Sequence, residues 1–145
     1  EFILERVADF NYLGSTLSNF VSVGVVVNRR IAKAAAVMAR LNRRVWKTPS
    51  LNMKITLRVY QACVIITLLY GSETWTTYAS QERKLNSFQL RCLRRILQIP
   101  RRDNIPNTEV LGRSQMTSMY AILTERRLRW LGNVVAYLRT SYMAK

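Results

Sequence analysis

The sequence predicts an all-α fold, a helical bundle of about four to five helices preceded by a short strand or loop segment. Glycine and proline are scarce, at 5 and 3 of 145 residues, which leaves room for long helices and few turns. Apolar residues make up 49% of the chain, enough to fill the core of one domain. From Val27 onward these residues recur three or four positions apart, which is the spacing of a helix with one buried face.

The N-terminal residues differ in composition from the rest of the chain. The stretch FNYLGSTLSN combines aromatic residues with Gly14 and two serines, which favours a short strand and a loop. We therefore divide one compact domain into three parts. Residues 1–24 are a connecting segment, residues 25–99 a helical bundle, and residues 100–145 a connector followed by a C-terminal helical extension.

The first predicted helix runs from about Val27 to Trp46. It ends before Pro49, because the residue preceding a proline disfavours the helical conformation. A second helix begins near Leu51 and is apolar on all sides between Val59 and Tyr70, which predicts a helix surrounded by others at the centre of the core. Gly71 and Ser72 are expected to close that helix.

Two further helices follow the central one, with a charged connector between them. The third spans roughly Gln81 to Gln98 and ends at Pro100, and its polar side is basic. Asn107 is predicted to cap a short helix that runs to Leu111. The last helix starts near Ser118, and its spacing places Trp130 among the residues that face the core.

Lysine and arginine outnumber acidic residues by 23 to 8, which gives a net charge of +15 and calls for an anionic partner. Nucleic acid is the first candidate and an anionic lipid surface the second. The longest apolar stretch falls short of the roughly 20 residues of a membrane span, so none is expected. The acidic start does not resemble a secretory signal, so we expect an intracellular protein, nuclear or cytoplasmic, with reduced cysteines.

Catalytic and metal-binding chemistry is not indicated. The chain has no histidine, and two cysteines cannot supply the four ligands of a structural zinc ion. The acidic residues occur singly, whereas two-metal phosphoryl chemistry needs clustered carboxylates. We expect no catalytic residue, metal site or cofactor in this chain.

The basic helix faces are the strongest compositional signal. An ordinary solvated helix alternates acidic with basic residues, yet the stretch from Val25 to Leu57 contains no acid. This pattern predicts contacts to nucleic-acid phosphates. A helix that lies on a membrane surface is the alternative to phosphate contacts. For Trp130, base stacking is the alternative to core packing. The predicted nucleic-acid-binding residues are Arg29, Arg30, Lys33, Arg40, Arg43, Arg44, Arg91, Arg94, Arg95, Arg126 and Arg129.

Five sequence words occur in an order that is similar to a known family. They are FNYLGS at 10–15, RRIAKA at 29–34, the run 54–75 ending in LLYGSETW, LNSFQLRCLRRIL at 85–97 and RLRWLGN at 127–133. Together they resemble the region after the polymerase palm in non-LTR (LINE-type) retrotransposon endonuclease-reverse transcriptases. The chain departs from that pattern at Asn133, where relatives usually have histidine, at Arg101, where a tryptophan is common, and from Val135 to Lys145.

The resemblance implies a thumb and C-terminal segment that holds the template-primer duplex. In that family the YLG word, here Tyr12 to Gly14, marks the passage from palm to thumb. The catalytic aspartates of the RNA-directed DNA polymerase would therefore lie upstream of Glu1, and the palm would be a partner within the full-length protein. The bound partner would be RNA-DNA hybrid or duplex, without sequence specificity. The alternative is a stray or repurposed helical fragment that acts through protein contacts or has no selected function.

Overall fold

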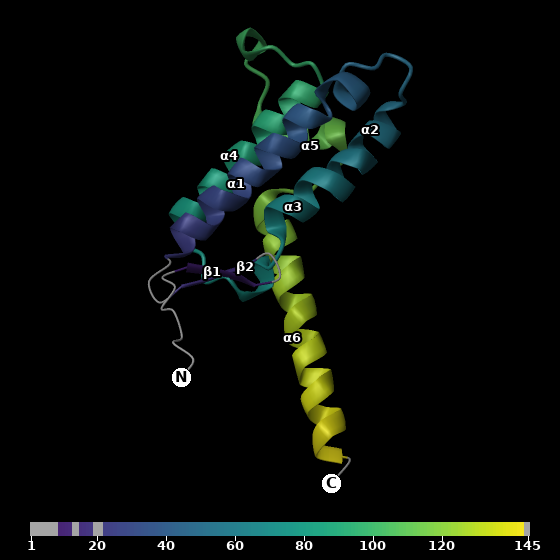
Figure 1. The fold of residues 1–145 in the computed structure, drawn as a ribbon. Helices are drawn as coiled ribbons and strands as arrows, with labels where there is room; N and C mark the ends of the chain where they lie inside the picture. Colours follow the sequence, from purple (N-terminus) through teal and green to yellow (C-terminus); the bar gives the residue numbers. More distant parts are fainter. Residues whose placement is uncertain (1–8, 13–14, 19–21, 144–145) are drawn as a thin grey trace.

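Helices make up most of the chain that the structure, a computed structural model, describes: residues 9–12, 15–18 and 22–143 (Figure 1). The predicted all-α helical bundle is confirmed. In chain order the elements are β1 (Asp9–Tyr12), β2 (Ser15–Ser18), α1 (Val23–Arg40), η1 (Asn42–Trp46), α2 (Met53–Val59), η2 (Tyr60–Ile65), α3 (Ile66–Leu69), η3 (Ser72–Thr74), α4 (Ala79–Ile96), η4 (Arg101–Asp103), α5 (Asn107–Ser114) and α6 (Met119–Met143).

The expected N-terminal strand is present as one half of a hairpin. β1 and β2 pair antiparallel, with Asp9 opposite Ser18 and Tyr12 opposite Ser15. The remaining residues of the predicted connecting segment lie outside the described part, apart from those from Ser22 onward.

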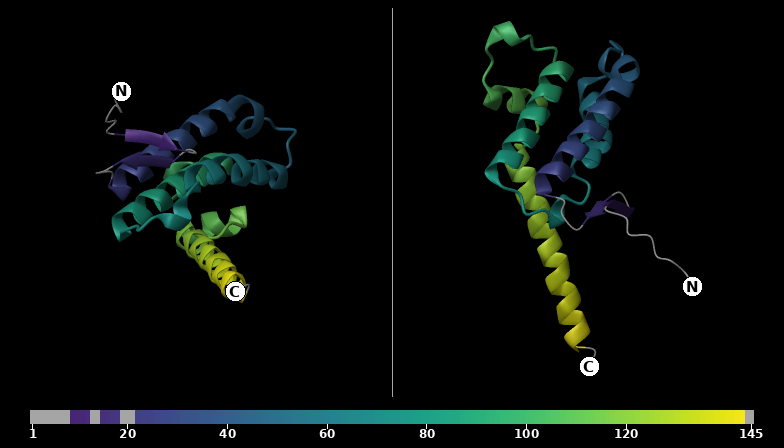
Figure 2. Two further views of the ribbon diagram at one scale, coloured as in Figure 1. Left: turned by 60° about the horizontal axis from the view of Figure 1, so that its bottom comes forward. Right: turned by 60° about the vertical axis from the view of Figure 1, so that its left-hand side comes forward.

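The bundle is arranged around α1. On one side α1 packs against η2 and α3, and on the other side against α4, which in turn contacts α5 and α6 (Figures 1 and 2). The interior is built from large apolar side chains of these helices. Tyr60, Leu68, Leu69, Leu85 and Leu93 have less than 2% of their surface exposed.

The second predicted helix is one continuous helical run, α2–η2–α3, with a π-helical middle. The side chain of Asn52 caps its start by accepting from the backbone N–H of Lys54 at 3.0 Å. Gly71 ends the run, as predicted, with a left-handed φ of 77° that glycine adopts without steric cost.

The expectation that this run is surrounded on all sides is wrong. Tyr60, Val64 and Leu68 face the core, but Ile66 on the other side is 52% exposed. The run contacts α1 along one side and lies at the edge of the bundle (Figure 1). Apolar composition alone did not distinguish a central helix from one whose outer face is also apolar.

The α5 region differs from the prediction at both ends. Pro106 is the residue before the helix, and Asn107 is its first residue instead of its cap. α5 also extends past Leu111 to Ser114. The following connection is anchored to the core, because the fully buried Gln89 donates from Nε2 to the carbonyl oxygen of Thr117 at 2.9 Å.

α6 begins in the bundle and then leaves it. Leu123 is 1% exposed, but from Leu128 to Met143 every residue except Val134 is exposed. Figure 1 and the right-hand view of Figure 2 show the C-terminal half of α6 extending away from the other helices. Trp130, predicted to face the core, lies on this extension and is 42% exposed, so that prediction is wrong. Its helical face is apolar as expected, but no other helix in the described ranges reaches this far along α6.

No helix within the described ranges combines the length and the apolar character needed to cross a bilayer.

Candidate nucleic-acid interface

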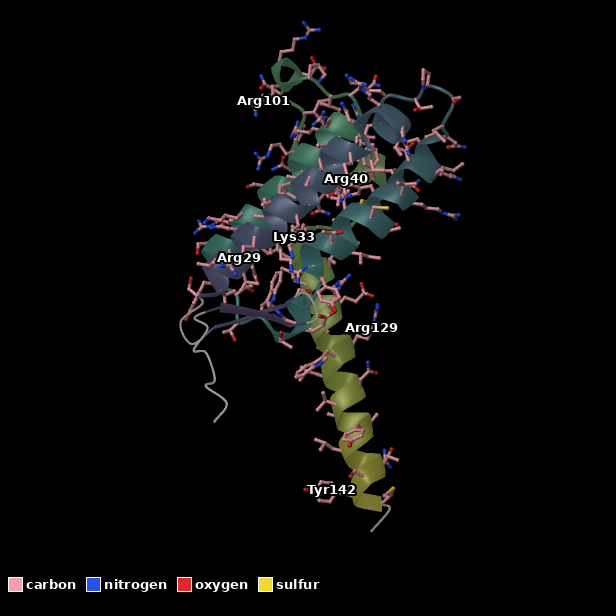
Figure 3. The ribbon with its side chains drawn as sticks, in the orientation of Figure 1. Arg29, Lys33, Arg40, Arg101, Arg129 and Tyr142 are labelled. Atoms are coloured by element: carbon pink, nitrogen blue, oxygen red, sulfur yellow. The ribbon has the colours of Figure 1, made fainter. Side chains whose placement is uncertain are left out.

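One face of α1 carries a row of cations. Val27, Ala34 and Met38 are buried against the neighbouring helices, so residues about half a turn away must face solvent. Arg29, Lys33 and Arg40 occupy these positions and are exposed. Figure 3 shows the three side chains spaced along the length of the helix.

The row continues into η1 because the chain folds back at the end of α1. Trp46 is buried, and its indole Nε1 donates to the carbonyl oxygen of Met38 at 2.8 Å. This contact holds the π-helical turn against the bundle and leaves Arg43, Arg44 and Lys47 exposed at its surface. Packing of Trp46 at the helix end therefore positions three further cations.

A second row of cations lies on α4, next to α1. Arg91 and Arg95 are exposed, and Arg95 donates to the side-chain oxygen of Asn42 at 3.1 Å, which ties α4 to η1. The two arginines line a groove of about 190 Å³ whose other walls are Ala35, Met38, Phe88 and Cys92.

Alanines separate the two rows, a feature that charge patterning alone did not indicate. By helix geometry Ala32, Ala35, Ala36 and Ala39 project between the α1 row and the α4 side, and all four are exposed. A methyl side chain lets a rod-shaped ligand approach the helix closely while cations reach it from both sides. The word RIAKAAAVMAR already contained this signal, because its alanines share the solvent side with the cations.

We name this region the α1–α4 basic surface. Its members are Arg29, Lys33, Arg40, Arg43, Arg44, Lys47, Arg91 and Arg95. Within the described chain, Lys33, Arg40, Arg43, Arg44, Lys47 and Arg91 form no ion pair.

Five carboxylates form ion pairs in the described chain, and all five lie outside the α1–α4 basic surface, between η3 and α6. Each of them faces a nearby arginine in that half of the chain. The pairs are Glu73 with Arg126, Glu82 with Arg127, Asp103 with Arg102, Glu109 with Arg113, and Glu125 with Arg129. Other exposed cations without an ion pair in the described chain are spread over four elements, whereas six gather on the α1–α4 basic surface. The scattered ones are Lys54, Arg58, Arg83, Lys84, Arg101 and Arg139.

Two predicted binding residues are not on this surface because they hold the bundle together. Arg30 is 7% exposed, and its guanidinium lies over the ring of Tyr70 at 4.9 Å from the centroid. Burial lowers the pKa of Arg30, partly countered by Tyr70. Arg94 donates to the carbonyl oxygen of Ile105 at 2.7 Å and to Asn107 at 2.9 Å, and so fixes the connector between α4 and α5.

Two more predicted residues, Arg126 and Arg129, lie on α6. Arg126 is paired with Glu73 at 3.2 Å and donates to the carbonyl oxygen of Leu69 at 3.4 Å, which attaches α6 to the end of α3. Arg129 pairs with Glu125 at 2.6 Å on the same helix. Both line a separate cleft of about 620 Å³ between the α2–η2–α3 run and α6, together with Arg58.

The thiols are free, and Cys92 lies beneath the α4 row. Burial raises the pKa of Cys92 to about 11, and Arg91 and Arg95 counter that effect only in part. Burial also raises the pKa of Tyr60, which lies beside Cys92. A thiol held protonated in this way is a poor nucleophile, so Cys92 is a core residue.

Comparisons with known proteins yield no match to a family model, to a curated protein or to a solved structure. No group of three or more His, Cys, Asp or Glu side chains that could hold a metal ion occurs within residues 22–143.

Proposed function

We propose that the α1–α4 basic surface binds the phosphate backbone of a nucleic-acid duplex, such as RNA-DNA hybrid, without reading its sequence. The observation that carries this proposal is the segregation of charge. Six exposed cations on one surface have no ion pair within the described chain, while the carboxylates between η3 and α6 have partners at a distance from it. Like charges held this close repel one another until an anion neutralises them.

The shape of the surface supports a duplex as the ligand. Two rows of cations flank a strip of alanines, so two lines of phosphates can be contacted at once while the helix backbone stays close. Contacts to phosphates position a duplex but carry no sequence information. Long lysine and arginine side chains on a convex helix face meet this need without entering a groove.

The resemblance to non-LTR retrotransposon reverse transcriptases agrees with such a role. A thumb holds the template-primer duplex while the palm performs the chemistry, and it must allow the duplex to slide. In this proposal the chain alone has no polymerase activity, and the catalytic aspartates belong to an upstream palm. The α1–α4 basic surface then acts as the thumb's grip on the phosphates.

The proposal is tested by measuring binding of a labelled RNA-DNA hybrid across a salt series. Each phosphate contact steepens the fall of log affinity with log salt by about 0.9. Replacing Arg40, Arg43 and Arg44 together by glutamate should flatten the slope by about 2.7 and abolish measurable binding near 200 mM salt. Circular dichroism should show unchanged helix content, because all three side chains are exposed.

The matched control makes the same charge change elsewhere. Arg101, Arg102 and Arg113 are exposed and lie on η4 and α5, outside the α1–α4 basic surface. Their replacement by glutamate should leave most of the affinity intact. Equal losses in the two triple variants would mean that only net charge matters. A flat salt dependence of the unaltered chain would favour the fragment that acts through protein contacts.

A further inference from the structure

The exposed half of α6 carries an apolar stripe with a regular spacing. Its members follow one another alternately three and four residues apart, which is the heptad repeat of helices that pair along a seam. All of them are exposed to solvent. The stripe consists of Ala121, Thr124, Leu128, Leu131, Val135, Leu138 and Tyr142, of which only Thr124 is polar, and we call it the α6 seam.

The seam is large enough to form an interface. Its large side chains range from Leu138, 47% exposed, to Tyr142, 79% exposed, and Tyr120 beside it is 41% exposed. At a rise of 1.5 Å per residue the seam is roughly 30 Å long. Standard interfaces remove about 800 Å² from each partner, and a helix pair of this length with five large apolar side chains per copy in the seam, and Tyr120 beside it, approaches that area. The bundle itself leaves this face uncovered (Figure 3, where Tyr142 marks its free end).

The charges beside the seam favour a second copy in the antiparallel direction. When two seams pack antiparallel around residue 133, Leu131 meets Val135 of the other copy and Leu128 meets Leu138. In that register the flanking positions bring Arg139 of one copy beside Glu125 of the other, and Gly132 beside Gly132. Glu125 and Arg139 are the acidic and the basic residue on that flank, and both are exposed. Glu125 also pairs with Arg129 of its own helix, and its second carboxylate oxygen can accept from Arg139 of the other copy.

Long-range repulsion selects the same direction. Each copy carries a net charge of +15. A parallel pair would place the two bundles side by side, whereas an antiparallel pair places them at opposite ends of the paired helices. The separation then exceeds the screening length of about 8 Å at physiological salt several times over.

We propose that two copies of this chain associate through their α6 seams as an antiparallel helix pair. The pair has two-fold symmetry, so the same residues serve both sides. It leaves the α1–α4 basic surface of each copy uninvolved, and this inference does not depend on the proposed function.

Sedimentation velocity of the nuclease-treated chain at high salt tests the association. The unaltered chain should reach twice the mass of one chain as its concentration rises. Replacing Leu131 and Val135 by aspartate should leave it monomeric at every concentration. The control variant, Asn133→Asp with Thr140→Asp, makes the same charge change on the opposite face of the same helix and should remain dimeric.

Charge exchange tests the direction. Arg139→Glu places glutamate against Glu125 and should weaken association about tenfold, and adding Glu125→Arg should restore it. Failure of the second change to restore association would overturn the antiparallel register. A monomeric unaltered chain would overturn the dimer, and if that monomer sedimented with phosphatidylcholine vesicles the seam would be a lipid-binding face.

Discussion

The role of an arginine in this protein depends on what its guanidinium meets. Arg40 faces solvent without an ion pair in the described chain, whereas Arg30 lies over an aromatic ring and Arg126 joins two helices. These three look alike in the sequence, because each stands in a basic stretch beside apolar residues. Arg30 and Arg126 were predicted to bind phosphate, but their contacts show that both join parts of the fold.

Substituting Arg126 and Arg40 separately should distinguish the two roles. Arg126→Ala leaves Glu73, whose side chain is 28% exposed, without its partner and removes the contact to Leu69. We expect a loss of about 1–2 kcal/mol in the free energy of unfolding. Arg40→Ala should change that free energy by less than about 0.5 kcal/mol.

Urea denaturation and hybrid binding, measured on the same preparations, provide the comparison. Arg40→Ala should weaken binding several-fold and flatten the salt dependence by about one contact. Arg126→Ala should bind almost as the unaltered chain does at temperatures where it is folded. A large loss of hybrid binding in a folded Arg126→Ala protein would mean that Arg126 contacts the nucleic acid after all.

At the scale of the helix, the spacing of apolar residues predicted the buried and the exposed face correctly where one face is buried and the other charged. The apolar residues of α1, spaced three and four apart, located both its core side and its exposed cations. The same spacing placed Trp130 inward, because it reports which residues share a face and not whether another helix covers that face. Whether a face is covered depends on where neighbouring helices end. For α6 and the outer side of α3 that information lies in tertiary packing and not in local spacing.

Glycine positions show how local conformation, unlike packing, could be predicted. Gly71 has a φ of 77° and closes α3, whereas Gly112 lies inside α5, where an added methyl group would meet no other atom within 4 Å. Gly71→Ala should cost about 1 kcal/mol or more, because an L side chain strains that conformation. Gly112→Ala should stabilise the protein by roughly 0.5–1 kcal/mol. Thermal denaturation of the two variants should shift in opposite directions, and shifts of the same sign would contradict this prediction.

Over the whole molecule, charge and apolar surface are divided between different regions. Six cations without ion pairs in the described chain gather over α1, η1 and α4, and five ion pairs lie between η3 and α6. The exposed apolar residues of α6 extend beyond the bundle. Net charge and composition indicated the first region from the sequence. The second and third depend on which residues the fold brings together, so arginine content could not reveal them.

The segregation of charge predicts that polyanions stabilise the folded chain. A ligand that binds only the folded state adds about 2.7 kcal/mol at a concentration one hundred times its dissociation constant. RNA-DNA hybrid should therefore raise the melting temperature by several degrees in low salt, and the gain should shrink as salt rises.

The Arg40, Arg43 and Arg44 triple glutamate variant should show little gain from hybrid. Without hybrid in low salt it should melt no lower than the unaltered chain, because the substitutions relieve repulsion between neighbouring cations. Differential scanning fluorimetry of both proteins across a salt series measures these shifts. An equal gain in the variant would mean that the duplex binds elsewhere, and a lower melting temperature of the free variant would mean that these arginines stabilise the fold.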